Sequence, residues 1–121
     1  MSPDRALKYL WDAHRAAERI ARFTAGSGHD EYLANDMMRA AVERQFEIIG
    51  EAFASLRRVD PGLAAGIPDL SRVVAFRNLL IHAYATVDDR LVWAVVERDL
   101  PRLRAALAGL LDRASGGQPE S

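Results

Sequence analysis

The segment VVAFRNLLIHAY, residues 73–84, decides how the rest of this sequence is interpreted. It is almost wholly apolar, and the only side chains in it that carry charge near neutral pH are Arg77 and His82. Its apolar residues recur at three- and four-residue spacing, which predicts a helix that ends at about Tyr84. An arginine and a histidine five residues apart within such a helix must serve either packing or chemistry.

The helices around this segment are predicted from the same periodicity. No stretch of the sequence alternates between apolar and polar residues as a half-buried strand does. The sequence therefore predicts an all-α fold, an antiparallel bundle of four main helices. The last helix is expected to kink at Pro101, whose ring removes a backbone hydrogen bond. The four helices are expected at about residues 3–24, 31–58, 68–84 and 88–113.

Length and composition bound the class of protein. The 121 residues suit a single domain, expected at residues 1–114 and followed by a flexible C-terminal tail at 115–121. The formal net charge is −1, so any contact with nucleic acid has to come from a local patch. The absence of cysteine excludes disulfides and thiolate metal sites. With neither a signal peptide nor an apolar run of about 20 residues, a soluble cytoplasmic protein is expected.

The central helix, projected at about 100° per residue, presents two faces. Val73, Phe76 and Leu80 mark the face expected to pack in the core. The opposite arc is expected to carry every polar side chain of the segment together with two aliphatic ones: Arg77, Asn78, His82, Tyr84, Val74 and Ile81. Aliphatic residues on a polar arc are typical of an interface, here with a second copy of the chain. In a two-fold dimer each Arg–His pair would meet its symmetry mate.

The polar side chains of this arc suit the cleavage of a phosphodiester without a metal. A neutral His82 can take the proton from a ribose 2′-OH, and a protonated one can give a proton to the leaving oxygen. Arg77 can stabilise the charge that develops on the phosphorus centre, and Asn78 can orient the histidine or the phosphate. Because the 2′-OH is the nucleophile, the substrate would be RNA. The alternative is structural: Arg77 pairs with a glutamate of the preceding helix, and His82 makes a hydrogen bond and nothing more.

The preceding helix offers a column of carboxylates at four-residue spacing, Glu43, Glu47 and Glu51. We interpret this column as a solvated, salt-bridged face. A divalent-cation site is the weaker interpretation, because hard cations are bound by oxygen ligands that converge from several directions. No metal and no cofactor are predicted.

The motif itself resembles a known one. Arg77 to His82, RNLLIH, resembles the R-x4-H motif of HEPN-domain proteins, and the longer FRNLLIHAY is similar to the HepT branch, R-x4-H-x-Y. The segment ERQFEIIGEA at residues 43–52 agrees with that branch, as do the short stretches at 67–68 and 87–88. The resemblance spans roughly residues 5–111. One departure is Asp69, which stands where a bulky aromatic residue is expected.

The resemblance implies a homodimeric, metal-independent endoribonuclease with Arg77, Asn78 and His82 as its catalytic residues. It further implies the toxin of a type VII toxin–antitoxin pair, neutralised when an MNT-type nucleotidyltransferase antitoxin adenylylates Tyr84. Val74 and Ile81 would lie at the dimer interface. Two other functions stay open. The chain can be a non-catalytic subunit that binds a nucleotide or a partner within a nucleotidyltransferase complex, or it can be a helical adaptor.

Overall fold

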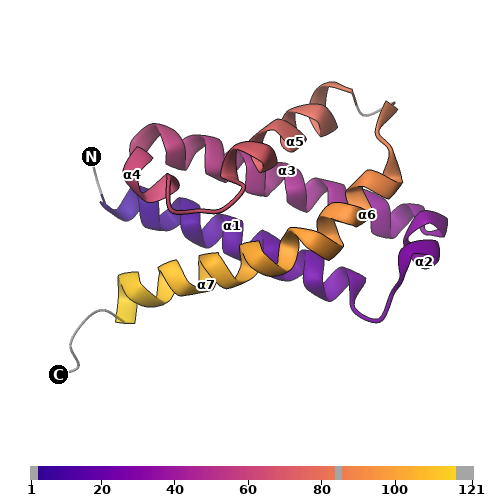
Figure 1. The fold of residues 1–121 in the computed structure, drawn as a ribbon, viewed down its shortest axis with the longest axis horizontal. Helices are drawn as coiled ribbons and strands as arrows, with labels where there is room; N and C mark the ends of the chain where they lie inside the picture. Colours follow the sequence, from indigo (N-terminus) through magenta and orange to yellow (C-terminus); the bar gives the residue numbers. More distant parts are fainter. Residues whose placement is uncertain (1–2, 84–85, 117–121) are drawn as a thin grey trace.

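The computed structural model describes residues 3–83 and 86–116, and within them all regular structure is helical, as predicted (Figure 1). None of the helices in these ranges is long and apolar enough to span a membrane. The helices in these ranges are α1 (Pro3–Thr24), α2 (His29–Ala34), α3 (Asp36–Val59), α4 (Pro61–Ala64), α5 (Leu70–His82), α6 (Asp89–Arg98) and α7 (Leu100–Gly116).

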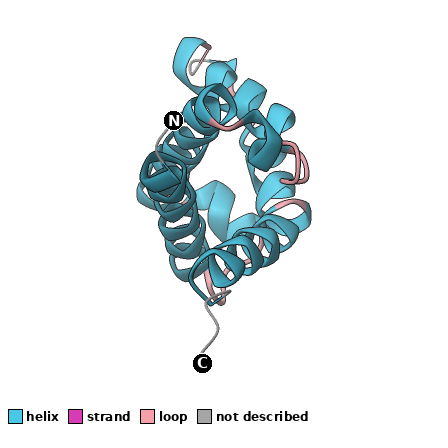
Figure 2. Ribbon diagram, turned by 90° about the vertical axis from the view of Figure 1, so that its left-hand side faces the viewer, coloured by secondary structure: helices cyan, strands magenta, loops and turns pink. Residues whose placement is uncertain are grey.

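The two longest helices, α1 and α3, pack side by side and form the middle of the bundle. Helix α5 packs on the other side of α3, and α7 packs on the other side of α1 (Figure 1). Seen end-on, the helices surround a common interior (Figure 2). One apolar core fills it, to which α1 contributes Leu10 and Ile20, α3 contributes Phe46 and Phe53, and α7 contributes Leu107. This order, α5–α3–α1–α7, places α5 and α1 on opposite sides of α3.

The predicted long helix at residues 31–58 is wrong at its beginning, because the chain breaks at Asn35. Asn35 has extended backbone angles, and its Oδ1 accepts a hydrogen bond from the Met38 N–H at 2.9 Å. The side chain therefore caps α3 and satisfies a backbone donor that would otherwise lack a partner. The preceding turn becomes the separate short helix α2.

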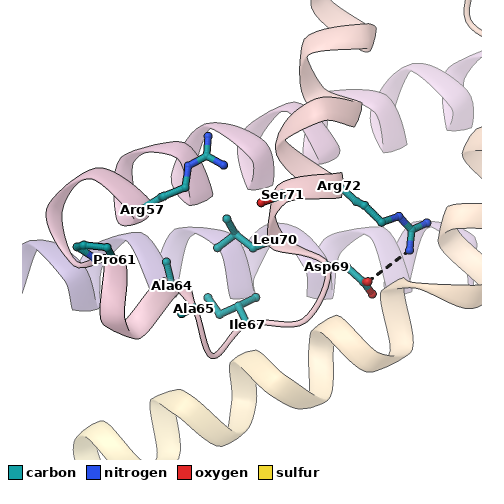
Figure 3. A pocket seen from close by; sticks show the side chains of 9 residues that line it. All are labelled: Arg57, Pro61, Ala64, Ala65, Ile67, Asp69, Leu70, Ser71 and Arg72. Atoms are coloured by element: carbon teal, nitrogen blue, oxygen red, sulfur yellow. Dashed lines mark hydrogen bonds and ion pairs between the residues drawn. The ribbon is translucent and has the colours of Figure 1, made fainter.

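Helix α5 begins after Asp69, whose backbone is in the left-handed region with a φ of 61°. The Asp69 carboxylate does not cap the helix but pairs with Arg72 at 3.3 Å and with Arg102 of α7 at 2.5 Å. Figure 3 shows Asp69 turned toward Arg72, at the edge of a cavity of about 390 Å³ beside Ile67 and Leu70. Where an aromatic residue was expected, this chain instead uses a carboxylate to tie α5 to α7.

The predicted interruption near Pro101 is confirmed, as a break between two helices at Asp99. Pro101 lacks an N–H, so it cannot continue the hydrogen-bond ladder of α6, but it is tolerated in the first turn of α7. The buried Asp99 accepts hydrogen bonds from Arg72 at 3.1 Å and Arg102 at 3.2 Å. Helix α7 then runs to Gly116, two residues into the segment expected to be a tail, while residues 117–121 lie outside the described part of the chain.

Candidate active site

The site is organised by the contact between Arg77 of α5 and Gly50 of α3. A Cβ atom placed on Gly50 would lie 2.2 Å from the Arg77 Cβ and 2.6 Å from its Cγ. The two helices therefore approach each other so closely that only glycine fits at position 50. A glycine inside a helix costs about 1 kcal/mol relative to alanine, so one in the middle of α3 has a packing reason. That cost was the signal in the sequence that could have identified Gly50 as part of the site.

The helical projection was wrong about the side on which Arg77 lies. The buried residues of α5 flank it, since Val73 and Val74 fall about 40° and 60° to either side at 100° per residue. The side chain of Arg77 is only 24 % exposed. Arg77 thus lies within the buried arc, because α3 presents a glycine there and the arginine's aliphatic stem can be covered while its guanidinium reaches the surface.

The guanidinium of Arg77 is held by two neighbours and retains one donor without a partner. Its Nη1 donates a hydrogen bond to Asn78 Oδ1 at 2.8 Å, and its Nη2 lies 3.4 Å from Glu51 Oε1. Its Nε is buried and has no hydrogen-bond partner. A buried donor left unpaired costs about 1–3 kcal/mol, so a shift of the guanidinium that brings Nε to an incoming oxyanion would be favoured. The pair with Glu51, whose carboxylate is well exposed, is of the weak kind that a phosphate can displace.

Asn78 and His82 lie one helical turn apart on the exposed face of α5. The side chain of His82 makes no hydrogen bond or ion pair with any described residue, and His82 is the last residue of the helix. Arg77 and His82 diverge by roughly 140° around the helix and about 7.5 Å along it. The structure therefore brings Arg77 and Asn78 into contact and leaves His82 apart from Arg77.

The remaining predicted site residues differ in exposure, and one of them lies outside the described part of the chain. Val74 is only 7 % exposed because it packs into the core of its own chain, whereas Ile81 is 39 % exposed. Of the two residues predicted at a dimer interface, Ile81 thus has apolar surface to bury. Tyr84, the predicted site of modification, lies outside the described residues.

The three carboxylates of the column on α3 each have a different environment. Glu47 pairs with Arg44 at 3.2 Å, and Glu51 pairs with Arg77, which agrees with a salt-bridged face. Burial raises the pKa of the Glu43 carboxyl, and the nearby charge of Asp89 acts in the same direction. Within residues 3–83 and 86–116 no group of His, Asp and Glu side chains is arranged to hold a metal ion.

A groove of about 190 Å³ adjoins the pair of Arg77 and Glu51. It runs between α1 and α3, where Tyr9 and Asp12 of α1 face Arg44 and Glu51 of α3. Glu51 lines the groove and also pairs with Arg77, so the groove borders this ion pair. The structural alternative predicted that Arg77 pairs with a glutamate of the preceding helix, and Glu51 is that glutamate, so it belongs to the site.

Comparison with known proteins identifies the family of the chain. The family model described as Ribonuclease HepT-like matches residues 13–110. A protein of Methanocaldococcus jannaschii named "Putative RNase MJ1380" is 34 % identical over 98 residues, which cover 79 % of this chain and 87 % of that protein. A protein of Thermococcus cleftensis named "Probable ribonuclease HepT" is 36 % identical over 96 residues, covering 79 % and 86 %. No solved structure matches. The chain therefore belongs to the ribonuclease HepT-like family.

Proposed function

We propose that the chain is a metal-independent endoribonuclease in which Arg77, Asn78 and His82 act on the scissile phosphodiester. The observation that carries the proposal is the state of Arg77. Its stem is clamped on Gly50, its Nη1 is oriented by Asn78, and its Nε is buried without an acceptor. A guanidinium held in this way, with a donor unused, is pre-organised to receive a phosphate oxygen.

Each group then has one task in the reaction. A neutral His82 takes the proton from the ribose 2′-OH, and the 2′-oxygen attacks phosphorus. Arg77 stabilises the negative charge that accumulates on the phosphoryl oxygens. The bond to the 5′-oxygen breaks, and that oxygen takes a proton from solvent water. The products are a 2′,3′-cyclic phosphate and a 5′-hydroxyl.

In this proposal the arginine and the histidine of one site come from two copies of the chain. Within one copy, Arg77 and His82 diverge around α5, so one phosphate cannot easily meet both. A two-fold dimer through the exposed end of α5, including Ile81, would place His82 of one copy beside Arg77 of the other. The exposed apolar surface of Ile81 supports an interface at this end of the helix.

The biological role we propose is that of a toxin, silenced by a nucleotidyltransferase antitoxin of the MNT type. The antitoxin would transfer AMP from ATP to the Tyr84 hydroxyl and release pyrophosphate. The position of Tyr84 supports this, because it follows His82 by two residues in the R-x4-H-x-Y pattern. A phosphate next to the motif would compete for Arg77 by charge and block access by size. Co-expression with such an enzyme would add the mass of one or more AMP units, and Tyr84→Phe would prevent it.

Cleavage of a labelled single-stranded RNA in the presence of EDTA tests the proposed reaction. We expect His82→Ala and Arg77→Ala to lose cleavage, and His29→Ala, an exposed histidine at the start of α2, to retain it. A chain that cleaves RNA only when a divalent metal is added would contradict the mechanism. A chain that binds a nucleotide or a nucleotidyltransferase without any RNA turnover would be the non-catalytic subunit instead.

A further inference from the structure

The outer surface of α1 carries a row of aromatic and arginine side chains, exposed except for the half-buried Arg19, which we name the α1 ridge. Trp11, Arg15, Arg19 and Phe23 follow one another at four-residue spacing, and Arg22 lies beside them. Trp11 is 49 % exposed and Phe23 is 38 % exposed. Residues at this spacing form one row along a helix, here about 18 Å long.

The three arginines of the α1 ridge are not paired directly with a carboxylate. The side chains of Arg15, Arg19 and Arg22 make no hydrogen bond or ion pair with any described residue, whereas most other arginines near a carboxylate are paired. Of the nearby carboxylates, Asp12 pairs with Lys8 at 2.8 Å, and Glu18 receives two hydrogen bonds from Arg104 of α7, both at 2.9 Å. The charge of Arg22 also acts on Glu18, but Arg104 is the main partner of that carboxylate, so the ridge keeps positive charge for a ligand.

The α1 ridge is also shaped to receive a ligand. A cavity of about 260 Å³ lies along it, lined by Trp11 and the three arginines together with His14 and Glu18. The indole of Trp11 packs edge-to-face on His14, with ring centres 5.8 Å apart and planes at 81°. This contact holds the indole in place while half of its surface remains in solvent. A large aromatic ring that is fixed and exposed is typical of a binding surface.

We propose that the α1 ridge binds single-stranded RNA, separately from the site that cleaves it. Bases would stack on Trp11 and Phe23, and the arginines between them would contact the phosphates, the combination by which proteins hold single strands without reading sequence. The chain has a formal net charge of −1, so attraction for RNA has to come from a local patch, and the ridge is one. The inference rests on the proposed ribonuclease function for the choice of RNA over other polyanions.

The position of the α1 ridge makes it a second site. Helix α3 lies between α1 and α5, and α7 packs beside the ridge through Arg104 and Glu18 (Figure 1). The α1 ridge shares no residue with the contacts of Arg77, so a bound strand would be held by side chains other than those of the cleavage site. Binding there raises the local concentration of RNA near the cleavage site without taking part in the chemistry.

Direct binding to a fluorescein-labelled single-stranded RNA tests the inference in the His82→Ala background, where cleavage does not interfere. We compare the triple variant R15Q/R19Q/R22Q with the control R57Q/R98Q/R113Q, which removes three exposed arginines from α3, α6 and α7. We expect the ridge variant to bind at least tenfold more weakly and the control to stay within twofold. The slope of log affinity against log salt should fall by about 2 in the ridge variant, as expected when three phosphate contacts of a single strand are lost.

The fluorescence of Trp11 distinguishes base stacking from purely electrostatic binding, which would not quench it. The other tryptophan, Trp93, is buried, so quenching of tryptophan fluorescence by RNA reports stacking on Trp11. We expect quenching in the parent chain and none in Trp11→Ala, together with at least fivefold weaker binding. Polyglutamate of similar charge should displace RNA poorly, because it offers no bases to stack.

Two results would overturn the inference: equal loss of affinity in the ridge and control variants, or binding that is unaffected by Trp11→Ala and readily competed by polyglutamate. The second result would identify an acidic protein as the ligand. Either failure is separate from failure of the proposed function. A chain that cleaves RNA with an unimportant ridge overturns the inference alone, and a chain that binds RNA through the ridge but never cleaves it overturns the function alone.

Discussion

Gly50 of α3 and Arg77 of α5 occupy one contact, in which the absence of a side chain on the first makes room for the stem of the second. The Cβ that any other residue would bring lies 2.2 Å from the Arg77 Cβ, far inside van der Waals contact. This relationship couples the stability of the bundle to the position of Arg77, the arginine of the proposed active site.

Gly50→Ala is therefore expected to destabilise the chain and to lower RNA cleavage. Forced overpacking costs typically 1–3 kcal/mol, which exceeds the gain of about 1 kcal/mol from better helix propensity. Urea unfolding measures the first effect and a cleavage assay the second. Gly109→Ala is the matched control, since a Cβ there meets Arg113 Nη1 at an ordinary 3.5 Å. That variant should be slightly more stable than the parent. Equal changes in stability and cleavage in the two variants would show that the contact between Gly50 and Arg77 is not their cause.

Glu51→Gln is expected to improve substrate binding, because the carboxylate competes with phosphate for Arg77. The stability should change by less than about 1 kcal/mol, as for other exposed pairs. Steady-state kinetics should show a KM for RNA that is several-fold lower. Glu97→Gln, an exposed glutamate of α6, makes the same change in net charge elsewhere. A fall in kcat in Glu51→Gln would instead mean that Glu51 positions the arginine.

Mixing two inactive variants tests whether the active site is shared between copies. In a dimer of one Arg77→Ala chain and one His82→Ala chain, one of the two shared sites keeps both an arginine and a histidine. We expect activity to reappear after the variants are unfolded together and refolded, up to about half that of the parent per dimer, by this count of intact sites. If each chain held a complete site, the mixture would stay inactive.

The ion pair of Glu18 with Arg104 is expected to make stability depend on pH in the acidic range. Hydrogen bonds from Arg104 hold the pKa of Glu18 below its ordinary value of 4.5. A lowered folded pKa gives stability that is present above the unfolded pKa and is lost as the pH falls through the folded one. Arg104→Ala should therefore be less stable than the parent at pH 7, and the difference should shrink below about pH 4.5. A difference in the free energy of unfolding that is constant with pH would assign the effect to packing.

The break at Asn35 shows where reasoning from periodicity stops. Apolar spacing continues through residues 31–58, so it predicts one helix, but the Asn35 side chain captures the Met38 N–H and begins a new one. That outcome depends on a local competition for one hydrogen bond, which periodicity does not record. The interruption near Pro101 was easier to predict, since a missing N–H interrupts a helix in any surroundings.

The sequence by itself determined the class of fold, most helix ends, the R-x4-H spacing and the chemistry that arginine, asparagine and histidine can perform. These follow from properties that each residue carries with it: periodicity, backbone geometry and side-chain groups. Only the tertiary structure decided that Arg77 lies on the buried side of α5, that Val74 belongs to the core and that Glu51 joins the site. The physical reason is that burial is set by the partner surface. Here the partner surface is Gly50 of α3, a residue with no side chain. The tertiary fold places it opposite Arg77, and a projection of α5 alone does not show this.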